Sequence, residues 1–268
     1  MDTLQLKSSK ILVIGDSCVD KYHFGISERL SPQAPVPIFK LSHTEEKQGM
    51  AGNVVQNLIN LGNNVELVTN DEIITKERFV DKASKQHLMR LDTGESSHIT
   101  SFIKSGKSIT FKDYDCVVFS DYNKGFLDIE SISYLFNILE KRDIPIFVDS
   151  KKVDLSYYKN CFVKINENEY KVLKKEPPNS GLIVTLGIKG AQYKNRIYNS
   201  YPSDVDNTNL SPNVCGAGDT FLAGLVTQYM STKNIDDAIH FANFCGSIAV
   251  KNFGTYVIKK EDLKRWKR

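Results

Sequence analysis

The feature that most constrains the fold is a regular alternation of short apolar runs with longer amphipathic stretches. Six five-residue runs lead into polar residues or glycine, as buried strands of a parallel sheet do: Ile11–Gly15, Val65–Thr69, Cys116–Ser120, Ile144–Val148, Cys161–Ile165 and Leu182–Leu186. Stretches with helical spacing lie between or after them: Asn53–Leu61, Ile129–Lys141 and Phe221–Met230. This order predicts an α/β fold, with a mostly parallel central sheet between two layers of helices.

Two segments break the alternation. Tyr22–Lys47 holds three prolines among alternating apolar and polar residues, and Phe79–Asp92 alternates similarly around a turn at Lys82–Lys85. Such patterns are typical of extended strands outside a main sheet, so we predict a small β lid within a single domain that spans residues 1–268. The alternative is that both segments are ordinary long loops. Because lid strands must bury one face, a second copy of the chain is a candidate partner, giving a homodimer through the lid.

Composition excludes several classes of protein. The 35 Lys and Arg residues against 32 Asp and Glu give a formal charge of +3, too small an excess to indicate a nucleic-acid partner. No apolar run approaches the ~20 residues of a membrane span, and Met1–Lys10 lacks the apolar core of a signal peptide. The five cysteines are scattered without a Cys-x-x-Cys pair, which favours reduced thiols. We therefore expect a cytoplasmic protein that binds neither nucleic acid nor a membrane.

The segment Cys215–Gly224 carries the strongest chemical signal. The apolar spacing after it predicts a helix that begins near Gly216. The first-turn N–H groups of Gly216, Ala217 and Gly218 would form an anion site at the positive end of the helix dipole. Beside them, Asp219 would take the proton of an acceptor hydroxyl while the amides hold a transferring phosphoryl group. The alternative is a glycine-rich turn with an ordinary helix-start acid.

Two further segments suit a sugar. Asp16 and Asp20 follow the first predicted strand, where ligands bind in α/β sheets, and carboxylates accept hydrogen bonds from sugar hydroxyls. Gly49 and Gly52 permit close backbone approach to a ligand, and Asn53 offers both a donor and an acceptor. The alternatives are that Asp16 stabilises its turn and that Asn53 is the N-cap of the helix that it opens.

Polar residues also follow the later strands. Asn166 and Glu169 come after the fifth predicted strand, where oxygen ligands suit Mg²⁺ held mainly through water and phosphate. Thr185 lies at the end of the sixth predicted strand and Gly187 and Gly190 follow it, and together they resemble a loop that lies along a nucleotide. The alternative for Glu169 is an ordinary helix-start acid.

Together these segments resemble the ribokinase-like (PfkB) carbohydrate kinases, and within them most closely the heptose-phosphate kinases of lipopolysaccharide-precursor synthesis. The likeness covers nearly the whole chain and rests on Gly15-Asp16, Asp20–Tyr22, Arg29–Pro32, Ala34–Pro37, Arg90–Asp92, Ser120–Tyr122 with Lys124-Gly125, Asp149 with Lys151, Asn166 with Glu169, and Gly216–Asp219. It implies a ribokinase-like three-layer sandwich with a β lid. It also implies transfer of the γ-phosphate of ATP, with Mg²⁺, to D-glycero-D-manno-heptose 7-phosphate, giving the 1,7-bisphosphate.

The resemblance also implies roles for single residues. Asp219 would be the catalytic base, with the amides of Gly216, Ala217 and Gly218 as an anion hole. The sugar would contact Asp16, Asp20, Gly49, Gly52 and Asn53. Asn166 and Glu169 would organise Mg²⁺ and the phosphates, and ATP would be bordered by Thr185, Gly187, Lys189, Gly190 and Asn243. Lys124 and Arg90 would be partners for the phosphate of the substrate, because an anionic sugar needs cations near it.

The chain also departs from the family pattern. Asn213 and Cys215 stand where the family usually has Asp-x-Thr, which leaves activation by a monovalent cation open. Met50 interrupts the glycine pattern of the sugar loop, and the stretch between Val68 and Arg78 is short. We also expect no nucleotidyltransferase half after the kinase. The alternatives are therefore a kinase for another sugar or a nucleoside, and a non-catalytic sugar- or nucleotide-binding relative. For Cys215 we expect a partly accessible thiol whose pKa the helix start lowers, or else a small buried spacer.

Overall fold

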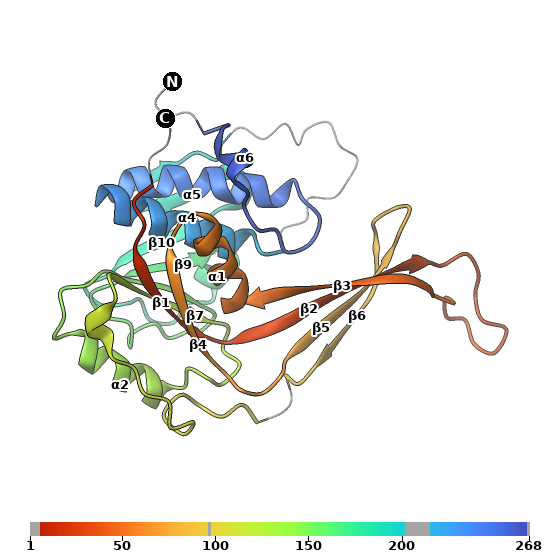
Figure 1. Ribbon diagram of the computed structural model, residues 1–268, viewed down its shortest axis with the longest axis horizontal. Coiled ribbons are helices and arrows are strands. Elements are labelled where there is room, and N and C mark those ends of the chain that lie inside the picture. The colour runs from red at the N-terminus through yellow and green to blue at the C-terminus, as the bar shows by residue number, and fades with distance from the viewer. Residues whose placement is uncertain (1–5, 96–97, 202–214, 267–268) are drawn as a thin grey trace.

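The computed structural model describes residues 6–95, 98–201 and 215–266, and its centre is an eight-stranded sheet (Figure 1). The strand order is β12-β11-β10-β9-β8-β7-β1-β4. Neighbours from β10 to β4 are parallel, and β11 and β12 are antiparallel at one edge. The bounds are β1 Lys10–Gly15, β4 Asn64–Thr69, β7 Cys116–Asp121, β8 Ile146–Ser150, β9 Phe162–Asn166, β10 Gly181–Thr185, β11 Ala191–Tyr193 and β12 Arg196–Tyr198.

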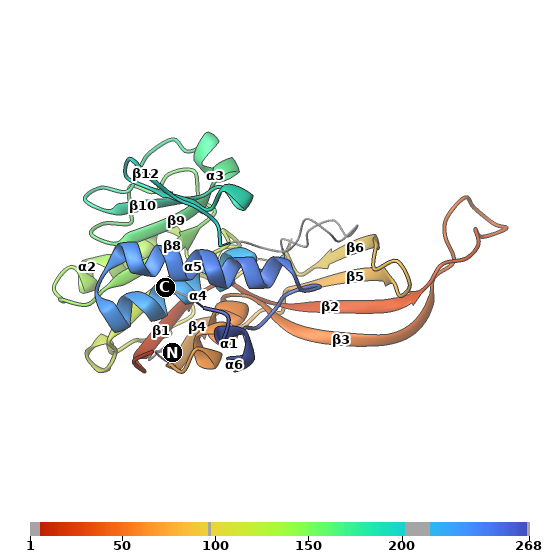
Figure 2. The same cartoon turned by 90° about the horizontal axis from the view of Figure 1, so that it is seen from above.

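Helices cover both faces of this sheet (Figures 1 and 2). Ile11 and Val13 of β1 belong to a core shared with α1 (Ala51–Asn60), α4 (Ala217–Thr232) and α5 (Ile235–Val250). The intervening Leu12 and Ile14 belong to a second core shared with α2 (Ile129–Leu139). Because both faces of the inner strands are buried, as in β1 and β7, these strands have no polar face and appear as apolar runs. The predicted three-layer α/β fold is confirmed.

The predicted strands and helices lie within four residues of their observed bounds, with the largest shift at the start of α4. The strand predicted over Ile144–Val148 is shifted along the sequence, because β8 begins at Ile146. The sequence did not predict β11, β12, α5 or the short helix α6 (Lys260–Leu263), and it anticipated α3 (Glu167–Lys171) only through the helix-start alternative for Glu169. Within the described part of the chain, no helix has the length and apolar character needed to cross a bilayer.

A separate four-stranded sheet projects from this body (Figure 2). Its order is β3-β2-β5-β6, with bounds β2 Ser17–Ile26, β3 Lys40–Met50, β5 Thr75–Asp81 and β6 His87–Thr93. The two segments predicted to form lid strands supply most of it, so the alternative of two long loops is wrong. It also takes in Ser17–Lys21 and Thr75–Arg78, which the sequence did not assign to it. We call this second sheet the lid sheet.

A buried ion pair joins two lid strands next to the body. Arg78 of β5 donates to Asp20 of β2 over 2.6 Å, and the two side chains are only 7% and 5% exposed. The second oxygen of Asp20 accepts from the hydroxyl of Thr255 at 3.3 Å, and Tyr22 lies 3.1 Å from the same hydroxyl. Because Thr255 belongs to the segment after α5, these contacts connect the lid sheet to the C-terminal part of the body.

Replacing Arg78 by Met should therefore lower the free energy of unfolding by about 3–5 kcal/mol, because Asp20 would be left buried without its cation. Arg90 lies opposite Arg78 in the β5–β6 register but makes an exposed pair with Asp92. Arg90→Met is the matched control and should change stability by less than about 1 kcal/mol. Urea unfolding of both variants measures the difference, and equally small losses would contradict a structural role for the buried pair.

Candidate active site

Asp219 lies in the first turn of α4, where the sequence predicted a helix start. The helix begins at Ala217, and Gly216 precedes it with φ 75°, in the left-handed region that favours glycine. A Cβ on Gly216 would also lie only 2.8 Å from the amide nitrogen of Asn53. The first N–H groups of a helix have no partner within the helix, so this turn presents amide donors beside Asp219.

Two hydrogen bonds fix the Asp219 carboxylate, which is 3% exposed. Its Oδ2 accepts from Asn53 Nδ2 at 2.9 Å, and its Oδ1 accepts from the Tyr122 hydroxyl at 2.5 Å. Burial raises the pKa of Asp219 to about 6, although both hydrogen bonds favour the charged form. A carboxylate with this pKa is ionised at neutral pH yet is a stronger base than an exposed one, as a general base should be.

Asn53 does not cap its helix. α1 begins at Ala51 after Met50, which makes no capping hydrogen bond through its side chain, so Asn53 lies within the first turn and the N-cap alternative is wrong. Its amide instead points at Asp219. Asn57, one turn later, donates to the Asn53 side-chain oxygen at 3.1 Å and so fixes which end of the amide faces the carboxylate.

A buried cation lies against the same helix start. Lys164 of β9 pairs with Asp149 of β8 at 2.6 Å, and the two side chains are 3% and 1% exposed. A Cβ on Gly218 would lie 2.8 Å from the Lys164 ammonium, so this charge contacts the glycine turn directly. Sequence reasoning missed Lys164, although a lysine inside an otherwise buried strand was a signal, since buried lysines are rarely without a paired role.

Asp16 lies beneath the loop that follows β7 and is fully buried. Its carboxylate accepts the backbone N–H groups of Tyr122, Lys124 and Phe126 at 2.9, 3.2 and 3.1 Å. Burial and the neighbouring Asp121 raise its pKa to about 6. The geometry thus gives Asp16 a role in holding the loop after β7, which the sequence did not predict, and contact with the sugar stays a prediction.

The other predicted sugar residues lie around the base of the lid sheet. Asp20 is held by Arg78, as described above. A Cβ on Gly49 would lie 2.6 Å from both the Asp20 carboxylate and the Cys18 sulfur, so this glycine lets Asp20 approach the backbone of β3. A Cβ placed on Gly52 would lie 3.0 Å from the Gln48 side chain.

The two cations predicted for a substrate phosphate are each paired with a carboxylate. Arg90 makes two hydrogen bonds to Asp92 on the exposed strand β6. Lys124 pairs with Glu95 at 2.7 Å. Both pairs are exposed enough that a phosphate of the substrate could replace the carboxylate as partner of the cation. Both roles therefore stay predictions.

Asn166 and Glu169 form a reciprocal capping box at the start of α3, so the helix-start interpretation of Glu169 holds. Glu169 also pairs with Lys151 at 2.7 Å, and Lys151 reaches Asp149 at 3.2 Å. These contacts place Glu169 in one charge network with the Asp149–Lys164 pair. Among the residues that the structure describes, no group of three or more His, Cys, Asp or Glu side chains is arranged to hold a metal ion.

The predicted nucleotide residues lie at the end of β10 and on α5. Thr185 ends β10, and Gly187 and Lys189 bound the short helical turn after it. Gly190 has φ 93° and lies so close to the backbone of Tyr198 that no side chain fits. Asn243 donates to the backbone oxygens of Tyr198 and Asn199 at 2.9 and 3.1 Å, so it anchors the segment after β12.

The prediction of a lowered pKa for Cys215 is wrong. Burial raises the pKa of this thiol, and this effect is larger than the opposite effect of the nearby Arg78 charge, which lowers the pKa. Cys215 is half-buried, and its sulfur lies 3.9 Å from the Tyr22 hydroxyl and 3.7 Å from Arg78. Asn213 lies outside the described residues. Activation by a monovalent cation, which the departure at Asn213 left open, therefore stays open.

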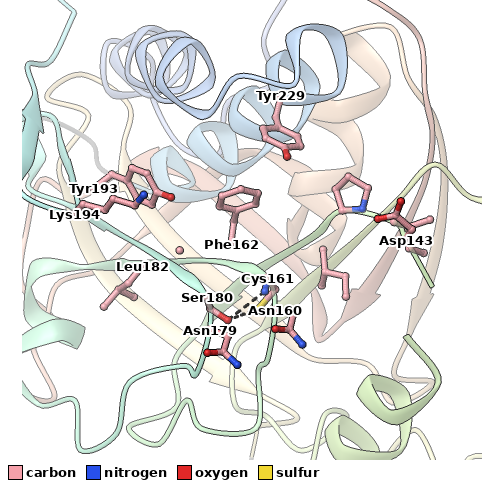
Figure 3. A pocket seen from close by; sticks show the side chains of 14 residues that line it. Asp143, Asn160, Cys161, Phe162, Asn179, Ser180, Leu182, Tyr193, Lys194 and Tyr229 are labelled. Atoms are coloured by element: carbon pink, nitrogen blue, oxygen red, sulfur yellow. Dashed lines mark hydrogen bonds between the residues drawn. The ribbon is translucent and has the colours of Figure 1, made fainter. Parts of the chain in front are cut away.

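A cavity of about 710 Å³ lies elsewhere, and none of the predicted site residues lines it (Figure 3). Its walls include Phe162, Gly181 and Ile146, which begin β9, β10 and β8, together with Tyr193 and Tyr229. This cavity is therefore at the amino ends of the strands, whereas Asp219 and its neighbours lie at the carboxyl ends, where α/β sheets bind their ligands.

Relatives with this sequence pattern are known. The model of the pfkB family carbohydrate kinases matches residues 136–262. The Bifunctional protein HldE of Nitratiruptor sp. is 30% identical over 307 residues, which cover 97% of this chain and 65% of that protein. HldE of Campylobacter curvus is 30% identical over 297 residues, which cover 93% and 63%. The chain thus spans less than two thirds of the length of these curated relatives.

Solved structures share the fold. Phosphofructokinase-2 from Escherichia coli, in complex with potassium, superimposes with a TM-score of 0.70 at 15% identity, covering 97% of this chain and 98% of that one. Ribokinase from Cryptococcus neoformans, in complex with ADP, gives 0.67 at 15% identity and covers 97% and 100%. The family match over residues 136–262 and the curated relatives make this chain similar in sequence to the pfkB family carbohydrate kinases, and the solved structures show that it has their fold.

Proposed function

We propose that this protein transfers the γ-phosphate of ATP to a hydroxyl of a sugar phosphate, with D-glycero-D-manno-heptose 7-phosphate as the first candidate. The observation that carries the proposal is the buried Asp219 carboxylate at the glycine start of α4, with the Lys164 ammonium against the same turn. A buried carboxylate next to amide donors is costly for folding and suits a base beside a transferring phosphoryl group. The heptose acceptor rests on the sequence resemblance to heptose-phosphate kinases.

In this mechanism Asp219 takes the proton of the acceptor hydroxyl while the hydroxyl oxygen bonds to the γ-phosphorus. The bond between that phosphorus and the bridging oxygen of ADP breaks, and ADP leaves. The first-turn amides of α4 and the Lys164 ammonium stabilise the charge on the transferring oxygens. The position of both at the start of α4, beside Asp219, supports this role.

The residues present fit a magnesium ion held mostly by phosphates. Glu169, in the first turn of α3 after β9, would hold Mg²⁺ through water, beside Asn166. When bound, the ion would neutralise charge on the β- and γ-phosphates. The loop Gly187–Gly190 would lie along the nucleotide, since no atom stands within 4 Å of a Cβ placed on Gly187, and Ile188 is 88% exposed.

We expect phosphorylated product when the protein is incubated with ATP, Mg²⁺ and sugar phosphates, with heptose 7-phosphate the best acceptor. The panel should include fructose 6-phosphate, ribose and a nucleoside, and mass spectrometry reads the products. A preference for ribose or the nucleoside would favour the alternative kinases. ATP binding without transfer to any acceptor would identify a non-catalytic relative.

Asp219→Asn should lower turnover by roughly a hundredfold or more, because it removes the base and keeps the shape. ATP binding should change little, since the amides of the helix start remain. Phosphoryl transfer and ATP titration on the same purified variant measure both effects. Near-normal turnover would contradict the mechanism.

The same variant should be at least as stable as the wild type at neutral pH. The pKa of Asp219 is raised to about 6 in the folded protein, so its ionisation costs stability as pH rises from about 4 to 6. The variant should therefore match the wild type near pH 4 and gain up to ~3 kcal/mol above pH 6. Thermal unfolding at pH 4 and pH 8 tests the sign, and a variant that is less stable at pH 8 would support a helix-start role instead.

We also propose that the lid sheet pairs with a second copy of the chain. All seven residues of its edge strand β6 are exposed, including Leu88, Met89 and Leu91 at 40%, 53% and 45%. An exposed apolar edge strand is a site for pairing or packing with another chain. Sedimentation should give a dimer for the wild type and a monomer for Met89→Glu/Leu91→Glu. A monomeric wild type at micromolar concentration would contradict the pairing.

A further inference from the structure

The second partner of Asp219 has no role in the mechanism above. Tyr122 follows β7 and donates its hydroxyl hydrogen to Asp219 Oδ1 at 2.5 Å. Burial, together with the charge of Asp219, raises the pKa of Tyr122 well above its usual value. Tyr122 is therefore protonated throughout the working pH range and acts toward this carboxylate as a donor.

Tyr122 is held in place from two sides. Its backbone N–H is bound by the buried Asp16 carboxylate, which also holds Lys124 and Phe126 of the same loop. The Lys151 ammonium lies 5.4 Å from the centre of its ring. The hydroxyl is thus aimed at Asp219 by contacts that do not involve Asp219 itself.

Several other charged or titratable groups face Asp219. Asp149 on β8 opposes its ionisation, whereas Asn53 on α1 and Lys164 on β9 favour it. The thiols of Cys18 on β2 and of Cys215 before α4 also lie within electrostatic reach. Both hydrogen bonds to the carboxylate, from Asn53 at 2.9 Å and from Tyr122 at 2.5 Å, favour its charged form, and bonds to an ionised acceptor are about twice as strong as neutral ones.

We propose that Tyr122 is a positioning residue that keeps Asp219 ionised at neutral pH and turns its Oδ1 toward the acceptor hydroxyl. A carboxylate oxygen accepts more than one hydrogen bond, so Oδ1 retains capacity for the substrate proton beside the Tyr122 bond. In the transfer step the proton moves from the acceptor oxygen to Asp219, and Tyr122 neither gives up nor gains one. The catalytic part of this inference rests on the proposed kinase function, whereas the effect on ionisation does not.

Tyr122→Phe tests the inference, and the chain offers a matched control. Tyr158 is also buried and donates to a buried carboxylate, that of Asp121, at 2.6 Å. In Tyr122→Phe the acidic limb of the kcat/KM profile should move to higher pH by about one unit, with a roughly tenfold loss below the limb and near-normal rates at pH 9. In Tyr158→Phe the limb should stay where it is in the wild type.

A second measurement reads the ionisation of Asp219 without activity. In protein with ¹³C-labelled aspartate carboxyls, the resonance missing from Asp219→Asn belongs to Asp219, and its titration midpoint should rise in Tyr122→Phe. Fluorotyrosine at position 122, a more acidic donor, should move the midpoint down, which keeps the test open if Tyr122→Phe fails to fold.

An unchanged midpoint, or a rate loss equal at every pH, would overturn the inference and leave Tyr122 as a packing residue. A wild type that phosphorylates no acceptor would instead overturn the proposed function, while the shift of the carboxyl midpoint would still decide the role of the Tyr122 bond.

Discussion

The structure depends on the burial of both faces of its central sheet. Alternate residues of β1 and β7 pack against α1 and α4 on one side and α2 on the other. Polar side chains that the chemistry needs are therefore excluded from most of the strand interiors and gather where parallel strands end. Asp16 and Tyr122 lie just beyond such ends. Lys164 and Asp149 lie within neighbouring strands, and their charges balance each other.

The candidate active site forms only when distant parts of the chain have packed together. Asp219 receives one hydrogen bond from Asn53, 166 residues away, and another from Tyr122, 97 residues away. Neither partner contacts the carboxylate until α1, α4 and β7 occupy their places. A carboxylate buried in this way lowers stability at neutral pH, and such costs are concentrated at functional sites.

The lid sheet is joined to this site by polar contacts at its base. The carboxylate of Asp20 connects Arg78 in the lid to Thr255 in the body, and the Tyr22 hydroxyl contacts the same threonine. Gly254, with φ 73°, lies against the Tyr22 ring where no side chain would fit. The base of the lid sheet is therefore joined to the body, whereas its outer strands β3 and β6 are largely exposed.

The sequence by itself determined the layer order, the six parallel strands and the start of α4, because apolar period and glycine placement are local properties. It did not predict β11 and β12, whose three residues are too few to show a period, or α5, whose buried residues form no narrow stripe. It also left open whether Asn53 capped its helix and gave the wrong direction for the pKa of Cys215. Those outcomes, like the Tyr122 and Lys164 contacts, depend on burial and on partners brought together across the chain, which only the tertiary packing decides.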